Sequence, residues 1–341
     1  MASLALLEES SLETEYSDQR ADRVTAIIPT CNRPALVRRA ILSALGQSYR
    51  RLDVVLVIDG CDEETRRLAS ELQNPRLTVV ELGENAGAAQ ARNIGVSAAR
   101  GEWVAFLDDD DEWLPHKIEM QMQCALISLA AHPVISSRVV VRTPAFDWIS
   151  PARVYIPNEP LSEYLFCRDR FVDGANYMQT STLLMQRQLM LKIPFQSHLK
   201  RHQDWDWLLR AATEAGVEFC MLPDALAVFN VEDGRTSIGR SLDWASSRSW
   251  ARDMRHAFTP RAYSFFIANE CVSRAAKAHA GGGTCARLAW EFFAQGQPSP
   301  RSLLSLAGFL CIPESIRNRV RQMVRRRRSV MTDAGVLSRT E

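Results

Sequence analysis

The chain has 341 residues, of which 46% are apolar and 24% charged, and a formal net charge of +1. This composition is that of a globular protein, and the length allows a domain of roughly 200–250 residues with an additional region. The net charge gives no indication of nucleic-acid binding. The best candidate for a membrane span, residues 303–312, has only ten residues. Crossing a bilayer takes roughly 18–20 apolar residues.

The first residues and the cysteines indicate a cytoplasmic protein. Residues 1–18 carry five acidic and no basic side chains, whereas a secretory signal begins with a basic region. The eight cysteines are dispersed and form no CxxC pair, which argues against a zinc site or a disulfide framework. We expect residues 1–21 to form a disordered tail because they are polar and unpatterned.

Strands and helices alternate along residues 23–107. Short β-branched runs predict buried strands, and apolar residues at helical spacing predict helices. Strands are expected over 23–30, 52–59, 76–82 and 102–107, and helices over 34–48, 63–73 and 88–100. This order is typical of a parallel sheet that is covered by helices on both faces.

The pattern changes after the fourth strand. Residues 135–160 indicate irregular, extended structure. A strand is expected over 178–186, a helix over 204–216, and two strands over 217–222 and 225–231. Beyond residue 240 the pattern is mainly helical.

Three polar clusters follow predicted strands: "PTCNR" at 29–33, "DGCDE" at 59–63 and "DDDD" at 108–111. Parallel sheets bind ligands beyond the carboxyl ends of their strands, so these clusters are expected to meet. Asp108 and Asp110 point to the same side of an extended chain. Carboxylates suit a hard divalent cation and the diphosphate that it carries. The alternative is a solvated acidic turn.

Five stretches resemble the family 2 glycosyltransferases of GT-A fold over about residues 22–240. They are "VTAIIPTCNRPALVRRAILSALGQSYRRLDVVLVIDGCDEET", "NAGAAQARNIG", "GEWVAFLDDDDEWLP", "MQTSTLLMQRQ" and "RHQDWDWLLRA". The resemblance implies an α/β, Rossmann-like GT-A fold with a mixed, mostly parallel sheet flanked by helices. It also implies an inverting transferase that uses Mn²⁺ or Mg²⁺ and a UDP-, dTDP- or GDP-linked sugar.

The resemblance also assigns donor and metal contacts. The cation would bridge Asp110 and Asp108 to the diphosphate, Asp109 would face the ribose or the sugar, and Asp59 would accept from a ring N–H of the base. Asp59 is alternatively a turn-starting residue before Gly60. The nucleotide-sugar contacts implied in this way are Pro29, Thr30, Asn32, Arg33, Asp59, Arg92 and Asp109. Arg92 is assigned to phosphate or acceptor contacts, and its alternative is an exposed helical arginine.

Asp204 lies where the family has its catalytic base, since Gln203–Asp206 resembles the family's Glu-Asp-Trp-Asp. A carboxylate in reach of the acceptor hydroxyl can take its proton. Asp204 is alternatively a first-turn acid that complements the helix dipole. Asp206 is the rival base, and it should point roughly 200° away around the helix.

Several residues depart from the family pattern. Ile58 replaces an Asp and Cys61 a Ser in the family's Asp-Asp-Gly-Ser, which leaves the nucleotide open, and Gln203 replaces a Glu. Neither His198 nor His202 is placed convincingly as a metal ligand. Residues 232–237 suit a mobile loop over the donor, in which Arg235 would meet the phosphates.

We predict a GT-A domain over 22–240 and a mainly helical region over 241–341. In the arm 314–328, an apolar stripe lies among arginines, which suits an anionic membrane surface rather than nucleic acid. A solvated helix packed on the domain is the alternative. The expected acceptor is a hydroxyl on a lipid-linked or cell-surface glycan, with the enzyme in the cytoplasm or peripheral at the inner face of the membrane. A nucleotidyltransferase and a non-catalytic nucleotide-sugar-binding protein are the other classes.

Overall fold

The computed structural model describes residues 22–168, 176–231, 241–312, 315–317 and 319. The tail 1–21, the loop 232–237 with Arg235 and most of the arm 314–328 lie outside the described residues. The chain divides into two compact units. The first takes its described residues from Met1–Thr143, Asp147–Pro157 and Met178–Glu232, and the second from Pro144–Phe146, Asn158–Tyr177 and Asp233–Glu341.

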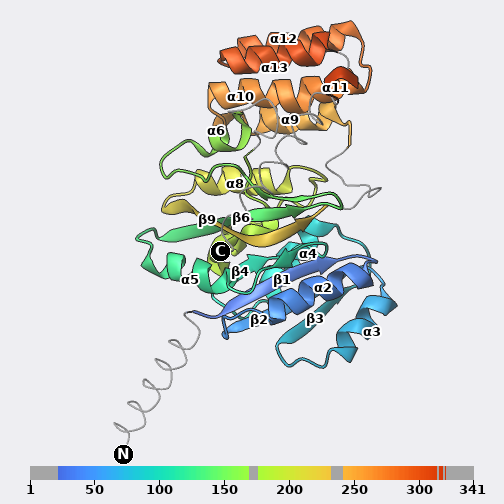
Figure 1. Ribbon diagram of the computed structural model, residues 1–341, viewed down its shortest axis with the longest axis vertical. Helices are drawn as coiled ribbons and strands as arrows, with labels where there is room; N and C mark the ends of the chain where they lie inside the picture. Colours follow the sequence, from blue (N-terminus) through green and yellow to red (C-terminus); the bar gives the residue numbers. More distant parts are fainter. Residues whose placement is uncertain (1–21, 169–175, 232–240, 313–314, 318, 320–341) are drawn as a thin grey trace, which may run out of the picture. The chain divides into compact units, whose positions relative to one another are not determined.

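The first unit contains a sheet that, within the described residues, has nine strands in the order β3-β2-β1-β4-β8-β6-β9-β5, with β7 paired to β6 (Figure 1). The strands are β1 Val24–Thr30, β2 Leu52–Asp59, β3 Leu77–Leu82, β4 Trp103–Phe106, β5 Glu112–Trp113, β6 His132–Arg142, β7 Asp147–Ser150, β8 Leu184–Gln186 and β9 Val217–Asn230. β1 runs parallel to β2 and β4, and β2 to β3, whereas β8 is antiparallel to β4 and β6. The prediction of a mixed, mostly parallel sheet is confirmed.

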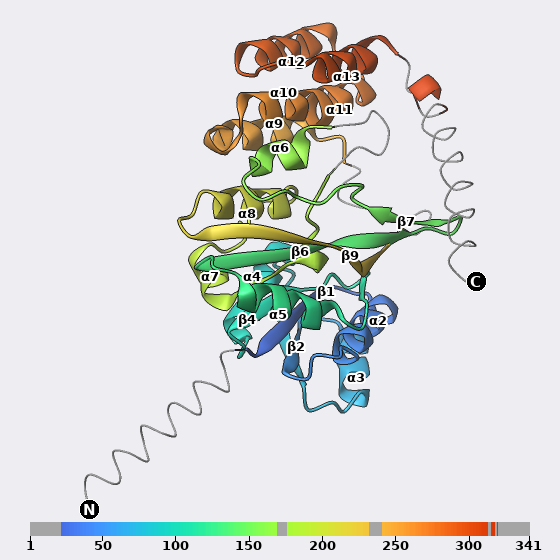
Figure 2. The same ribbon diagram turned by 60° about the vertical axis from the view of Figure 1, so that its left-hand side comes forward.

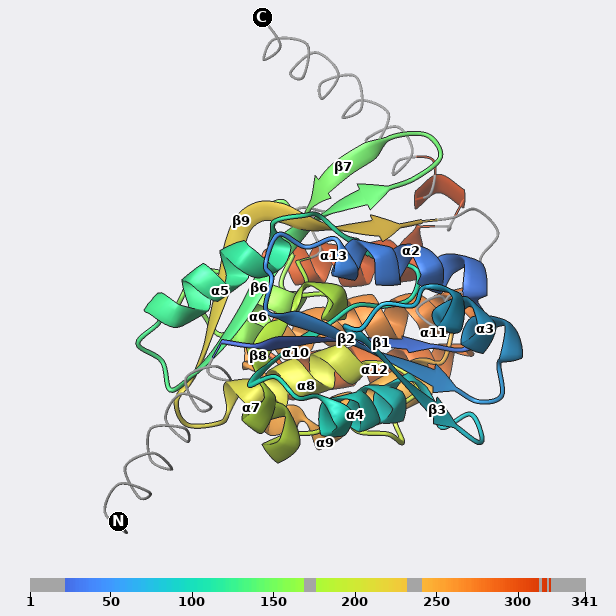
Figure 3. The same ribbon diagram turned by 90° about the horizontal axis from the view of Figure 1, so that it is seen from below.

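Helices cover both faces of the β3-β2-β1-β4 part of the sheet. They are α2 Pro34–Leu45, α3 Glu63–Glu71 and α4 Ala88–Ala98, and the unit continues with α5 Lys117–Ile127, α7 Arg187–Lys192 and α8 Gln203–Ala212. Figure 3 shows α2 and α3 on one face of the sheet and α4 on the other. Because both faces are covered, β1 and β4 are buried along their whole length, as their continuous apolar sequences require.

Gly95 allows α4 to approach the sheet closely. A Cβ at this position would come within 2.5 Å of Ile27 Cγ2 and 3.2 Å of Val57 Cγ2. We therefore expect Gly95→Ala to lower the free energy of unfolding by about 1–3 kcal/mol in a denaturant titration, because the added methyl group overpacks the core. Ser97→Ala on the exposed side of the same helix is the control, with an expected change below about 0.5 kcal/mol. Equal midpoints for the two variants would contradict the close approach.

Two predicted elements differ from the structure. The first half of the strand expected over 178–186 is a short 3₁₀ turn, η1 Thr180–Thr182, in which the Thr182 hydroxyl donates to the Gln179 carbonyl at 2.7 Å. The two strands expected over 217–222 and 225–231 form the single strand β9. This strand pairs with β6 on both sides of Pro223. Register shifts before and after Arg138 leave Pro223, Asp224 and Leu226 without a partner on β6.

The second unit is helical, which confirms the predicted helical C-terminal extension. Its elements are α6 Leu161–Phe166, α9 Trp244–Asp253, η3 Arg255–Ala257, α10 Pro260–Phe266, the π-helical turn η4 Ile267–Val272, α11 Ser273–Lys277, α12 Gly282–Ala294 and α13 Pro300–Cys311. Phe166, Phe258 and Phe266 form its aromatic core, with the rings of Phe166 and Phe258 stacked at 4.9 Å. Across the described part of the chain, every helix is too short or too polar to cross a membrane.

Candidate active site

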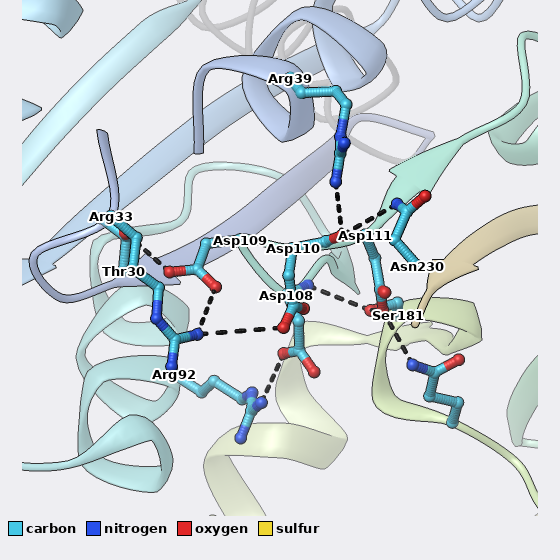
Figure 4. Close-up of polar contacts among 11 residues, drawn as sticks. Thr30, Arg33, Arg39, Arg92, Asp108, Asp109, Asp110, Asp111, Ser181 and Asn230 are labelled. Atoms are coloured by element: carbon cyan, nitrogen blue, oxygen red, sulfur yellow. Dashed lines mark hydrogen bonds and ion pairs between the residues drawn. The ribbon is translucent and has the colours of Figure 1, made fainter. Parts of the chain in front are cut away.

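The loops after β1 and β4 meet at the carboxyl edge of the sheet (Figure 4). The Thr30 hydroxyl, at the end of β1, donates to Asp109 Oδ2 at 2.9 Å. Arg33 Nη1 donates to Asp109 Oδ1 at 3.1 Å. The polar clusters that follow two strands far apart in the sequence therefore form one site, as expected for ligand binding by a parallel sheet.

The four acidic residues separate into two groups. Asp109 turns toward Thr30 and Arg33, whereas Asp108, Asp110 and Asp111 each place one carboxylate oxygen within 4.8 Å of the others. Asp108 and Asp110 are the predicted metal ligands. Asp111 was not predicted as one, and it completes a set of three oxygen donors that suits Mg²⁺ or Mn²⁺.

Asp111 is the most deeply buried member of this acidic triad, with 1% of its surface exposed. Its Oδ2 accepts hydrogen bonds from Gln179 Nε2, at 2.8 Å, and from the Ser181 hydroxyl. Its Oδ1 is buried, and none of the described residues donates a hydrogen bond to it. Burial, and then the charges of Asp108 and Asp110, raise the pKa of Asp111 well above its ordinary value. A buried oxygen without a donor among like charges is what a cation would satisfy, so these residues fit a divalent ion.

Backbone contacts hold the acidic turn in place. The Asp110 carbonyl accepts hydrogen bonds from Arg39 Nη2 of α2 and from Asn230 Nδ2 at the end of β9, both at 3.0 Å (Figure 4). The Asp108 amide donates to the Ser181 hydroxyl at 3.1 Å. Elements from three parts of the chain therefore fix where the carboxylates point.

Asp109 is held apart from the triad as a buried, hydrogen-bonded carboxyl group. Burial raises its pKa, and so does the charge of Asp108. The charge of Arg33 and the hydrogen bond from Thr30 lower it, and the net shift is upward. The side chain is thus kept on the β1 side of the site, where it is predicted to face the ribose or the sugar.

Arg92 projects from α4 and is buried, so the alternative of an exposed helical arginine is wrong. Its Nη2 donates to Asp108 Oδ1, and its Nη1 donates to Gln203 Oε1 at 3.1 Å. The guanidinium also lies over the Phe195 ring at 5.5 Å. Burial lowers the pKa of Arg92, but the charges of Asp108, Asp204 and Asp109 raise it by more. Arg92 thus connects the acidic turn to the start of α8.

The start of α8 carries the two candidate bases. Burial is the largest influence on Asp204 and raises its pKa, Asp108 raises it further, and the charge of Arg92 lowers it, with a net upward shift. Asp206 is buried, and its Oδ2 accepts a hydrogen bond from Arg210 Nε at 2.7 Å on the same helix. Asp204 thus interacts with the groups of the site, whereas Asp206 has an ion-pair partner on its own helix. Both also lie in the first turn, where they complement the helix dipole.

The remaining predicted contacts lie around the β1 and β2 loops. Asp59 accepts hydrogen bonds from the amides of Ala86 and Gly87, at 2.7 and 2.9 Å, and so holds the loop before α4. Each of its oxygens keeps a further lone pair for a ligand. Asn32 is exposed, with a left-handed φ of 54°, and Pro29 is buried within β1. Pro29 therefore shapes the loop rather than presenting a side chain.

The two histidines considered as further metal ligands do not belong to the triad. His202 is the N-cap of α8, with a φ of 63°. Its ring stacks on that of Trp205, with 4.8 Å between ring centroids.

Comparison with known proteins agrees with this geometry. Residues 25–175 match the family described as glycosyl transferase family 2. The amylovoran biosynthesis glycosyltransferase AmsB of Erwinia amylovora is 28% identical over 256 residues, which cover 70% of this chain and 82% of AmsB. The succinoglycan biosynthesis protein ExoO of Rhizobium meliloti is 28% identical over 223 residues and 64% of each chain.

Among solved structures, the mannosyltransferase PcManGT of Pyrobaculum calidifontis, in complex with GDP-Man and Mn²⁺, has the same fold. Its TM-score is 0.52 at 19% identity, over 88% of this chain and 84% of PcManGT. Residues 25–175 of this chain therefore match glycosyl transferase family 2, and the chain has the GT-A fold.

Proposed function

We propose that this protein is an inverting, metal-dependent glycosyltransferase that moves a sugar from a nucleotide-sugar donor to a hydroxyl acceptor. The observation that carries the proposal is the acidic triad at the carboxyl edge of the sheet, in which a buried Asp111 oxygen receives no hydrogen bond from the described part of the chain. A divalent ion bound by Asp108, Asp110 and Asp111 would supply positive charge to the leaving diphosphate. Mn²⁺ and Mg²⁺ both suit three oxygen ligands.

Residues of the chain would bind the donor and take up the proton of the acceptor. Asp109, held by Thr30 and Arg33, would contact the ribose or the sugar. The loop Pro29–Arg33 and Asp59 would hold the base of a UDP-, dTDP- or GDP-linked donor. Asp204 would accept the proton of the acceptor hydroxyl as the new bond forms, because its raised pKa makes it a better base than an ordinary aspartate. A single in-line displacement inverts the anomeric centre.

Arg92 would hold the metal ligands and the catalytic base in position relative to each other. Its contacts to Asp108 and Gln203 connect the metal ligands to the helix that carries Asp204. These two contacts use two of the five N–H groups of the guanidinium, so the others could still meet a donor phosphate. We therefore assign it first to orienting the two groups and second to phosphate contact.

The proposed pathway class is the synthesis of cell-surface polysaccharide or lipopolysaccharide. AmsB and ExoO are named for amylovoran and succinoglycan biosynthesis, and PcManGT is named with GDP-Man and Mn²⁺. An acceptor hydroxyl on a lipid-linked glycan, and a cytoplasmic enzyme peripheral at the inner membrane face, belong to the same proposal. We place the catalytic domain at 22–240 and assign no role in nucleic-acid binding.

Release of the nucleoside diphosphate tests this function. UDP-, dTDP- and GDP-sugars would be incubated with Mn²⁺ and a bacterial lipid extract as the acceptor, with matched reactions in EDTA. We expect nucleoside diphosphate only when donor, acceptor and metal ion are all present. A parallel reaction would contain nucleoside triphosphates, sugar 1-phosphates and Mn²⁺, and release of pyrophosphate there would indicate a nucleotidyltransferase instead. Tight donor binding without turnover would indicate a binding protein.

A further inference from the structure

Helices α12 and α13 of the second unit expose a broad apolar surface. Both helices pack on the η4 turn of the helix beneath them, and Figures 1 and 2 show them side by side over α10 and α11. Leu288, Phe292 and Leu306 fill the inner side. We call the large exposed apolar residues of the two helices, together with Ile312 directly after α13, the α12–α13 surface: Trp290, Phe293, Leu303, Leu304, Leu310 and Ile312.

The size of these side chains is unusual for a water-facing surface. Trp290 is 67% exposed and Phe293 is 54% exposed, although burying such rings would stabilise the protein. Single exposed apolar residues need no explanation, but large apolar groups gathered on two neighbouring helices indicate a binding surface.

The exposed charges of α12 and α13 have one sign. Glu291, the one acidic residue in the sequences of α12 and α13, is buried and accepts hydrogen bonds from Arg248 Nε and the Tyr263 hydroxyl, both at 2.6 Å. The exposed charged residues of the two helices are Arg287 and Arg301. Between α13 and residue 328 the sequence contains one acid, Glu314. From Arg319, which is exposed, it continues with five more arginines and no acid up to residue 328.

Helices that expose aromatic and leucine side chains, arginines and no acid are complementary to an anionic bilayer. Tryptophan side chains lie at the level of the lipid headgroups, and arginines pair with lipid phosphates. A second copy of the chain fits less well, because a two-fold dimer would bring together helices whose exposed charged residues are all arginines.

We propose that the α12–α13 surface docks on an anionic lipid bilayer, with Trp290 and Phe293 entering the headgroup region and Arg287 contacting lipid phosphates. The docking itself does not depend on the transferase chemistry. Its use, which is to bring the enzyme to a lipid-linked acceptor, rests on the proposed function.

Vesicle co-sedimentation of the full chain tests the docking. The variant is Trp290→Gln/Phe293→Gln. The matched control is Leu126→Gln/Ile127→Gln, which removes two apolar side chains of α5 that are 61% and 80% exposed. We expect wild type and control to sediment with vesicles of phosphatidylcholine and phosphatidylglycerol, and much less with phosphatidylcholine alone. The variant should lose about tenfold or more in partitioning, and Arg287→Glu about tenfold.

Two results would overturn the proposal. One is equal sedimentation of the variant and the wild type, or equal sedimentation with both kinds of vesicle. The other is a dimer in light scattering that requires Trp290, with no vesicle binding, because a second copy would then cover the surface. Calorimetric donor binding in the same samples separates the two proposals. Vesicle binding without donor binding would contradict only the proposed transferase function. Donor binding without vesicle binding would contradict only the proposed docking.

Discussion

Asp204→Asn is expected to lower kcat by about 10²- to 10⁴-fold, the usual contribution of a positioned general base. Asparagine keeps the size of the side chain but does not take the proton of the acceptor hydroxyl. The dissociation constant of the donor should stay within about twofold, since Asp204 is assigned to the acceptor and not to the donor. Initial rates and calorimetric donor titrations on the same preparation give both numbers.

The raised pKa of Asp204 adds a pH dependence to this prediction. The ordinary value is 3.8, and burial raises it, so kcat/KM should fall as the pH drops through the raised value and the base becomes protonated. A carboxyl group with a raised pKa in the folded state favours folding below its unfolded pKa, and this contribution is lost as the pH rises. Asn at position 204 carries no charge, so the variant should be at least as stable as the wild type at pH 7. Loss of activity then does not reflect unfolding.

Asp206→Asn is the matched control on the same helix. It removes the carboxylate that pairs with Arg210, so we expect a loss of about 1–3 kcal/mol in unfolding free energy and a kcat close to that of the wild type. The reverse outcome, an inactive Asp206→Asn protein beside an active Asp204→Asn protein, would assign the base to Asp206.

Asp110→Asn is expected to weaken metal-dependent donor binding by about a hundredfold, because it removes one charged ligand of a cation that holds the diphosphate. The metal-free protein should not be destabilised, since the charge of Asp110 is among those that raise the pKa of the buried Asp111. Calorimetry with donor and Mn²⁺ measures the first effect, and thermal unfolding in EDTA measures the second.

Glu112→Gln is the control for charge at the same turn. Glu112 lies two residues after Asp110 but forms ion pairs with Arg39 and Arg142, each at 3.3 Å, outside the acidic triad. Its variant should bind donor within about twofold of the wild type, as expected for loss of partly exposed ion pairs. If Glu112→Gln and Asp110→Asn weakened donor binding equally, general electrostatics rather than metal ligation would explain the site.

The strands and helices in the first half of the fold could be predicted because the pattern of each one lies within its own short segment of sequence. β1, β2 and β4 are short, mostly apolar runs, and α2 and α4 have helical spacing, so each element can be recognised from its own residues. β6 could not be recognised in this way. Arg138 interrupts its apolar pattern, and its pairing with β7, β8 and β9 comes from distant parts of the chain.

The same distinction between local and distant sequence applies to the site residues. The spacing of Asp108 and Asp110 predicts a pair of ligands, and the triad contains both. Asp111 was missed because its burial depends on Gln179 and Ser181, which lie 68 and 70 residues away in sequence. The length of the acidic run was the available signal, since four adjacent carboxylates are hard to accommodate unless one of them is turned inward.

Cation-dependent binding of a nucleotide sugar is the central claim, and isothermal titration calorimetry tests it most directly. The wild-type protein would be titrated with UDP-, dTDP- and GDP-sugars in Mn²⁺, in Mg²⁺ and in EDTA. The site described here predicts that at least one donor binds with either ion, that none binds in EDTA, and that the heat is lost in Asp110→Asn. Absence of cation-dependent heat with every donor, or equal binding in EDTA, would contradict the account.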